Sequence, residues 1–364
     1  MQRRVLFYVG HPAHYHNIRN LCAKLTEKNI PVLIAARHKD VLFRLLENCP
    51  YETVLMGAGS GRSKAAVAMH LLDREWQMLK VIRKFRLTLM MGTDMIITHI
   101  GKLLGIPAFI LNEDDAEAVP LFARLAYPLA TGIFAPLPCS VGKYKKKKIG
   151  YAGYHELAYL HPSYFVPDPT RIDHLEKPFY LLRFVELTAH HDVGKKGIGQ
   201  DLALKIIGKL SEHGRVYISS ERKLEAMLEP FRLVIPPADM HHVLHGAAMF
   251  IGDSQTMTAE AAVLGTPALR FNDFVGKLGY LEELEHTWKL TFGFRTSEEN
   301  KLLQKIDELL SVKDIKAEWN TRKQAMLAAS ADLTSLLDWF ISRFPESYDT
   351  VKNDPGFYRD FITR

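Results

Sequence analysis

The feature that most constrains this fold is a repeated alternation between short apolar runs and segments with helical spacing. Val5–Val9 is apolar and ends at Gly10. A polar segment follows, and then Ile18, Leu21 and Leu25 recur at helical spacing. Short apolar strands joined through helices predict parallel sheets covered by helices on both faces. The sequence therefore predicts an α/β protein with doubly wound sheets.

Two series of such units are expected along the chain. The first has predicted strands over 5–9, 31–35, 53–56, 95–98 and 108–111, with further helices over 40–46, 65–85 and 100–104. The second has predicted strands over 179–182, 216–219, 233–235, 249–251 and 268–271, with helices over 200–211, 223–228, 240–247 and 258–264. Residues 298–343 are predicted to be helical.

A length of 364 residues suits two domains of about 150 residues each. Helical and strand periodicity fails between Pro138 and Pro178, where Pro, Tyr and charged residues accumulate. We therefore predict a Rossmann-like N-terminal domain over 1–165 and a second over 176–340. We expect the tail over 341–364 to pack back on the first domain.

Composition places the chain among compact soluble proteins, with 47% hydrophobic and 24% charged residues. The apolar stretch near the N-terminus is too short for a signal peptide, and no segment reaches the roughly 18 apolar residues of a transmembrane helix. A cytoplasmic location is expected. Cys22, Cys49 and Cys139 are odd in number and lack metal-ligand spacing, which argues against disulfides and a zinc site.

The formal charge of +6 favours anionic ligands or an anionic membrane surface but is too small to indicate nucleic-acid binding. The basic residues concentrate in Lys143–Lys148, which Tyr144 interrupts. One interpretation is a solvated interdomain loop. The other is a contact with anionic lipid head groups, peripheral to the inner face of a membrane, or with an acceptor phosphate.

The most informative loop is GDSQTMTAEAAVLGTPALR, from Gly252 to Arg270. A predicted strand ends at Gly252, and a helix begins near Thr256. Amide groups at a helix N-terminus attract phosphate, and the hydroxyl groups of Ser254 and Thr256 add donors. Glu260 can accept hydrogen bonds from ribose hydroxyl groups. A capped helix without a ligand is the alternative interpretation.

This string resembles the nucleotide-binding segment of GT-B glycosyltransferases and UDP-N-acetylglucosamine 2-epimerases. The resemblance implies that Ser254 and Thr256 bind phosphate and that Glu260 binds ribose, while Gln255 and Thr256 replace the paired glycines of these families. Together with GHPAHYHN, EDDAEA and GYHELAYL, it makes the chain similar to the GT-B group catalogued as domain of unknown function 354, over about residues 5 to 290. The implied fold is two Rossmann-like domains facing a cleft.

The loop GHPAHYHN brings His11, His14 and His16 into the first connection between strand and helix. A neutral imidazole suits general-base work on an acceptor hydroxyl, and an imidazolium suits phosphate binding. The resemblance to GT-B glycosyltransferases implies that His14 is the base. Helix capping and local hydrogen bonding are the alternatives, and the spacing does not favour a metal.

The loop NEDDAEA follows the predicted strand 108–111, and its carboxylates could supply an acid or a base. The resemblance to the epimerases places a catalytic glutamate here. Glu113 is the nearest match, with Asp114 and Asp115 adjacent. Acidic residues that cap the next helix are the alternative.

Two positions bear on the type of reaction. The epimerases have an aspartate at the end of the preceding strand, and we expect His99 to occupy that position in this chain. They also have a histidine after the first strand of the second domain, where this chain has Arg183. Arg183 stays protonated and suits a diphosphate. These differences favour glycosyl transfer.

Other histidines are weaker candidates. His242 stands where related proteins contact the base or phosphate, while His190, His191 and Asp192 belong to a polar loop that could line the ligand site.

We therefore expect a nucleotide-sugar-dependent glycosyltransferase, with a UDP-linked donor and a saccharide or lipid-linked acceptor. By resemblance, it would act in polysaccharide or glycolipid assembly, with His14 and Glu113 catalytic and with Arg183, His242, Ser254, Gln255, Thr256 and Glu260 binding the donor. No Asp-x-Asp motif is present, so no metal and no cofactor are predicted. The alternatives are a UDP-sugar 2-epimerase or hydrolase using Glu113 and His99, and a non-catalytic nucleotide-sugar-binding protein.

Overall fold

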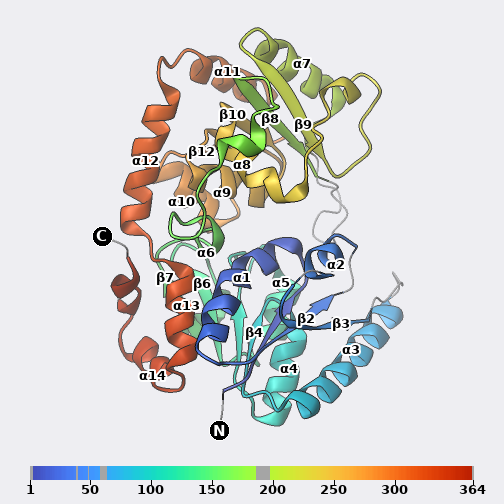
Figure 1. Cartoon of the computed structure of the whole chain (residues 1–364), viewed down its shortest axis with the longest axis vertical. Coiled ribbons are helices and arrows are strands. Elements are labelled where there is room, and N and C mark those ends of the chain that lie inside the picture. Colours follow the sequence, from blue (N-terminus) through green and yellow to red (C-terminus); the bar gives the residue numbers. More distant parts are fainter. Residues whose placement is uncertain (1–2, 38–39, 48, 58–63, 186–196, 363–364) are drawn as a thin grey trace. The chain divides into compact units, whose positions relative to one another are not determined.

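The computed structural model describes residues 3–37, 40–47, 49–57, 64–185 and 197–362. The chain divides into two compact units. The first contains the residues up to Tyr159 together with those from Ser330 onward, and the second contains Leu160–Ala329. Each unit is built on its own parallel sheet, shown in Figure 1. The predicted doubly wound α/β class is thereby confirmed.

The sheet of the first unit has seven strands in the order β3-β2-β1-β4-β5-β6-β7. The strands are β1 (Val5–Val9), β2 (Val32–Arg37), β3 (Glu52–Met56), β4 (Leu89–Gly92), β5 (Ala108–Leu111), β6 (Gly132–Pro136) and β7 (Lys148–Tyr151). The order reverses between β1 and β4, and such switch points are where open α/β sheets bind ligands. The residues that follow these two strands are therefore candidates for ligand binding.

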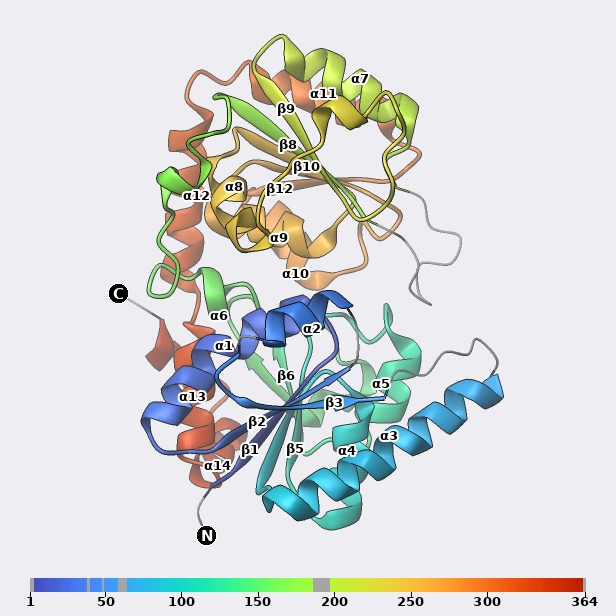
Figure 2. The same ribbon diagram turned by 45° about the vertical axis from the view of Figure 1, so that its right-hand side comes forward.

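Helices cover both faces of this sheet (Figure 2). On one face lie α1 (Pro12–Glu27), α2 (Asp40–Glu47) and the C-terminal α13 (Leu333–Ser342), with α14 (Glu346–Asn353) following. On the other face α3 (Lys64–Phe85) packs on α4 (Met95–Leu104), and α4 packs on α5 (Pro120–Ala126).

The C-terminal tail is an integral part of the first unit. The ring of Phe340 lies 5.0 Å from that of Phe109 and 4.8 Å from that of Phe134, measured between centroids. Lys28 on α1 forms an ion pair with Asp338 at 2.6 Å. These contacts belong to α13. The first unit therefore includes the chain from Ser330 onward, whereas the sequence led us to expect only the tail from position 341 to pack on it.

The sheet of the second unit has five strands in the order β12-β11-β10-β8-β9. They are β8 (Phe179–Phe184), β9 (Arg215–Ser220), β10 (Met249–Gly252), β11 (Ala268–Phe271) and β12 (Thr291–Phe294). The helices are α7 (Gln200–Ser211), α8 (Met240–Gly246), α9 (Gln255–Leu264), α10 (Gly279–His286), α11 (Glu299–Leu310) and α12 (Ile315–Ala329), and α6 (Leu157–Leu160) lies where the chain leaves the first unit. Here the order reverses between β8 and β10.

Several predicted elements are wrong. Residues 95–98 belong to helix α4, whose N-cap Asp94 accepts a hydrogen bond from the amide of Ile96 at 3.0 Å. The strand before it is β4, at 89–92. Residues 223–228 form no helix and 233–235 no strand, while β6, β7 and β12 were missed. Because α4 buries Ile96, Ile97 and Thr98 in succession, its apolar run resembles that of a buried strand.

Within the part of the chain that the structure describes, no helix is long and apolar enough to cross a membrane.

Candidate functional site

In the second unit, the edge where β8 and β10 end is closely packed. A Cβ atom added to Gly252 would lie 2.9 Å from the Cβ of Arg183 and 3.0 Å from its carbonyl oxygen. Such contacts are too close for a side chain, so β10 needs glycine here. The chain then turns directly into α9 next to the end of β8.

Ser254 is the N-cap of α9. Its Oγ accepts a hydrogen bond from the amide of Met257 at 3.2 Å. Because that oxygen acts as an acceptor, the hydroxyl hydrogen can still be donated to an anion beside the first turn. Gln255 and Thr256 are half-buried on the same turn. The capping and phosphate-binding interpretations of Ser254 are therefore compatible.

Glu260 lies on α9 and is buried, with 6% of its surface exposed. Its Oε1 is 3.0 Å from Nε2 of His241, on α8. A buried carboxylate is costly without a hydrogen-bond donor, and the His241 ring supplies one. The carboxylate is thereby held in a fixed orientation one to two turns beyond the start of α9. The sequence analysis did not predict a role for His241 and named the adjacent His242 as the candidate ligand contact.

His242 makes different contacts. Its Nδ1 accepts a hydrogen bond from the amide of Asp168 at 3.0 Å, and its ring lies 4.9 Å from that of Phe165. Burial lowers the pKa of His242, which keeps the ring neutral and suits this acceptor role. His242 therefore holds the segment by which the chain enters the second unit. A nucleotide contact for His242 stays a prediction.

Arg183 ends β8 with its guanidinium already engaged. Nη1 donates to Oγ of Ser219 at 2.7 Å, and Nη2 pairs with the carboxylate of Glu221. Only 15% of its side chain is exposed. A diphosphate at this position would compete with Glu221 for the guanidinium.

Asp253 follows β10 and is buried. Its Oδ1 accepts a hydrogen bond from the amide of Val185 at 2.8 Å, and the amide of Ile198 also donates to this carboxylate. Burial raises the pKa of Asp253 to about 6. The carboxylate thus joins residues on both sides of segment 186–196. His190, His191 and Asp192 lie in that segment, outside the described residues.

In the first unit, His14 lies on the first turns of α1. The backbone amide of Gly10, which can only donate, points at Nδ1 of His14 at 3.2 Å, and Oγ1 of Thr93 lies 2.7 Å from the same nitrogen. Nδ1 is therefore an acceptor, and a neutral His14 carries its proton on Nε2. His11 caps the helix by accepting from the amide of Ala13 at 3.3 Å.

Glu113 follows β5 and contacts His155, which lies beyond β7. Oε2 of Glu113 is 3.5 Å from Nδ1 of His155 and accepts weakly from its amide at 3.4 Å. Burial lowers the pKa of His155 to about 3, although the adjacent carboxylate favours the imidazolium. His155 is therefore neutral. It belongs to the string GYHELAYL, whose histidine was not singled out.

The neighbouring carboxylate of Asp115 has a structural role. Its Oδ1 accepts a hydrogen bond from the amide of Ser140 at 2.6 Å. The carbonyl of Asp114 accepts from the side-chain amide of Asn112 at 2.9 Å. Glu113, by contrast, contacts a histidine ring, that of His155.

The alignment of His99 with the epimerase aspartate is wrong, because β4 ends at Gly92. His99 lies inside α4, where Nδ1 is 2.6 Å from the carboxylate of Glu75 and Nε2 is 3.3 Å from the carbonyl of Leu125. The residues that follow the strand are Thr93 and Asp94. Asp94 forms an ion pair with Arg74 at 3.0 Å. An aspartate therefore does follow the strand before β5, and this difference from the epimerases disappears.

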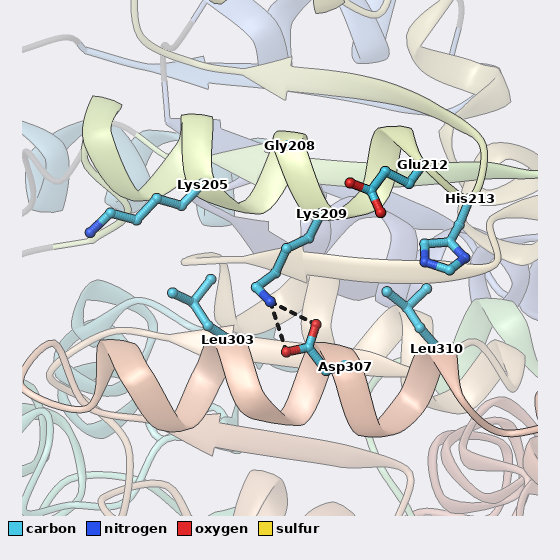
Figure 3. A pocket seen from close by; sticks show the side chains of 8 residues that line it. All are labelled: Lys205, Gly208, Lys209, Glu212, His213, Leu303, Asp307 and Leu310. Carbon is cyan, nitrogen blue, oxygen red and sulfur yellow. Dashed lines mark hydrogen bonds and ion pairs between the residues drawn. The ribbon is translucent and has the colours of Figure 1, made fainter.

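A surface depression of about 440 Å³ lies between α7 and α11 (Figure 3). Lys209 spans it with an ion pair to Asp307 at 2.7 Å. Its lining residues come from α7, the turn after it and α11, away from the carboxyl ends of β8 and β10. It includes no side chain of the candidate site. Among the described residues, no group of three or more His, Cys, Asp and Glu side chains is arranged to hold a metal.

Two Rossmann-like units are the architecture of GT-B proteins, and solved structures of this class match nearly the whole chain. The UDP-GlcNAc 2-epimerase from Neisseria meningitidis, bound to UDP-GlcNAc, is 11% identical, with a TM-score of 0.65 over 93% of this chain and 99% of that one. The S. aureus MnaA–UDP co-structure is 12% identical, with a TM-score of 0.65 over 97% and 98%. The spinosyn rhamnosyltransferase SpnG, complexed with thymidine diphosphate, is 14% identical, with a TM-score of 0.60 over 93% and 99%.

The sequence profile of the family DUF354, described as protein of unknown function, matches residues 5–274. The chain belongs to this family, as its motifs predicted. No curated protein matches the chain.

Proposed function

We propose that the second unit binds a UDP-linked sugar at the start of α9. The observation that carries this proposal is the buried pair of Glu260 and His241, which fixes a carboxylate beside a helix N-terminus capped by Ser254. In this assignment Glu260 binds the ribose, while Ser254, Gln255 and Thr256 bind the diphosphate. Arg183 joins them by exchanging Glu221 for phosphate.

The reaction that we propose is glycosyl transfer to a saccharide or a lipid-linked acceptor. The helix dipole and Arg183 would stabilise the leaving diphosphate. His14 and Glu113 are the proposed acid–base residues. His14 would first have to change tautomer to accept a proton at Nε2, whereas a carboxylate such as Glu113 needs no such change.

A second candidate, epimerisation or hydrolysis of the UDP-sugar, gains support from Asp94. This aspartate follows β4, and Glu113 follows β5, so both carboxylates stand after adjacent strands of the first unit. Arg183 argues against it, because a guanidinium cannot replace the histidine that the epimerases have at this position.

Two measurements test the proposal. UDP should raise the melting temperature, because a ligand that binds only the folded state stabilises it by mass action. Glu260→Ala should abolish most of this shift, and an equal shift in the variant would refute the ribose assignment. Incubation with UDP-N-acetylglucosamine alone then separates the reactions, since an epimerase changes the sugar without an acceptor. Binding without turnover on any acceptor would indicate a non-catalytic binding protein.

A further inference from the structure

The solvent-facing side of α3 exposes apolar side chains where an amphipathic helix usually presents polar ones. Met69, Leu72 and Trp76 recur at helical spacing and are 68%, 64% and 58% exposed. Each is large, and together they form one stripe along the helix. Single exposed apolar residues are ordinary, but a contiguous row indicates a surface that binds something.

The same stripe becomes basic toward the C-terminal end of α3. Lys80, Arg83 and Lys84 are exposed, and Nζ of Lys80 lies 3.4 Å from the centre of the Trp76 ring. Lys84 is 3.8 Å from the carboxylate of Glu52. Asp73 is an acidic residue on the stripe, and its carboxylate accepts a hydrogen bond from Gln77. The stripe thus joins an apolar half to a cationic half.

The neighbouring helices also expose large apolar side chains. On α4 and α5, Leu103 and Leu121 are 69% and 68% exposed. The His99 ring bridges Glu75 of α3 and the carbonyl of Leu125 of α5, which places the middle of α3 close to α5. We call the exposed side chains of Met69, Leu72, Trp76, Leu103 and Leu121 the apolar face.

Exposed basic residues also lie on α4, on α5 and in the lysine run. Lys102 and Arg124 are exposed. In the run, Nζ of Lys147 binds the carbonyls of Tyr127, Pro128 and Ala130 at the end of α5, which fixes the run beside that helix. Lys148 is also engaged, with two backbone carbonyls. Lys143, Lys145 and Lys146 remain exposed, so three of the five lysines contribute to a surface charge.

We propose that the apolar face docks the first unit on a bilayer that contains anionic lipid. Large apolar side chains suit the boundary between head groups and acyl chains, while the surrounding lysines and arginines attract anionic head groups. A second copy of this chain would bring like charges together and fits less well. This inference goes beyond the proposed function, because it needs no nucleotide.

Co-sedimentation with vesicles tests the proposal, using phosphatidylcholine with and without phosphatidylglycerol. Wild-type protein should bind only the anionic vesicles at low salt. The variant Leu72→Gln/Trp76→Gln should bind at least tenfold more weakly, because two apolar side chains no longer enter the bilayer. The matched control Met227→Gln/Val234→Gln changes exposed apolar residues of the second unit and should bind like wild type.

Trp76 also provides a direct signal, since its fluorescence should shift to shorter wavelength on anionic vesicles and be quenched by brominated lipid. Lys80→Gln/Arg83→Gln should weaken binding most at low salt. Circular dichroism and the melting temperature of each variant verify folding. Equal binding of the apolar variant and the wild type would overturn the proposal. So would a concentration-dependent dimer that Leu72→Gln dissociates, because the apolar face would then bind a second copy.

Discussion

Between pH 7.5 and pH 5, the free energy of unfolding of the wild-type protein should fall by about 2 kcal/mol more than that of the variant His155→Gln. The pKa of His155 falls from 6.5 to about 3 because the ring is buried. The unfolded chain binds a proton at its ordinary pKa, whereas the folded chain does not. The stability contributed by the neutral ring is therefore fully present above pH 6.5 and is lost as the pH falls toward 3.

The magnitude follows from the distance between the unfolded pKa of 6.5 and the assay pH. An assay at pH 5 is about 1.5 units below that pKa. Protonation stabilises the unfolded chain by about 1.36 kcal/mol for each of these units. Glutamine has no titrating group, so its free energy of unfolding lacks this component. Other histidines titrate in both proteins, and their effects cancel when the two pH profiles are subtracted.

Two units can unfold separately, so the assay must report on the first one. All three cysteines, Cys22, Cys49 and Cys139, belong to that unit. Urea unfolding can therefore be followed by the labelling of thiols with a dithiodipyridine, which reacts at acidic pH. Parallel pH profiles for wild type and His155→Gln would refute the reasoning, since they would mean that the buried ring takes up its proton without cost.

Three further predictions concern the cap, the lysine run and the acid–base residue. Ser254→Ala should lower the free energy of unfolding of the second unit by about 1 kcal/mol and weaken UDP binding, whereas Ser254→Asn should keep the cap, as thermal unfolding with and without UDP would reveal. Lys147→Gln should destabilise the first unit by about 1–3 kcal/mol in urea unfolding, because three carbonyls lose a charged donor, while Lys145→Gln should not. His14→Ala should keep UDP binding and reduce turnover about 100-fold in a product assay, and equal loss of both would make His14 a ligand anchor.

Much of the fold could be predicted because β1, β5, β8 and β11 are short apolar runs that end in polar or glycine-containing loops. Strand and helix could not be distinguished where burial on all sides removes the difference between their apolar patterns. In α4, Asp94 and a left-handed Gly105 mark the ends of the helix, but the apolar residues between them repeat too densely for a clear period. Strand β7 was missed because it begins at Lys148, directly after a run of charge.

The positions of Ser254 and Glu113 in the fold could be predicted because each is the second residue after a short apolar strand. Partners that come from distant parts of the chain could not be. His241 and His242 are adjacent on one helix, and their sequence does not tell which ring faces Glu260. Likewise, the contact of His155 with Glu113 depends on the pairing of β6 with β7, a strand that was not predicted.

The position of β4 determines which residues surround His14. A Cβ atom on Gly92 would lie 2.4 Å from the carbonyl oxygen of Tyr8, so glycine lets β4 approach β1 closely at the switch point. Thr93 can then reach the ring of His14, while Asp94 is drawn to Arg74. A carboxylate beside Nδ1 would place a proton on that nitrogen and leave Nε2 basic, but a threonine and a backbone amide leave the proton on Nε2. In this tautomer Nε2 of His14 donates, so His14 must change tautomer before it can accept a proton there, a change that the proposed acid–base role requires and that a carboxylate such as Glu113 does not need.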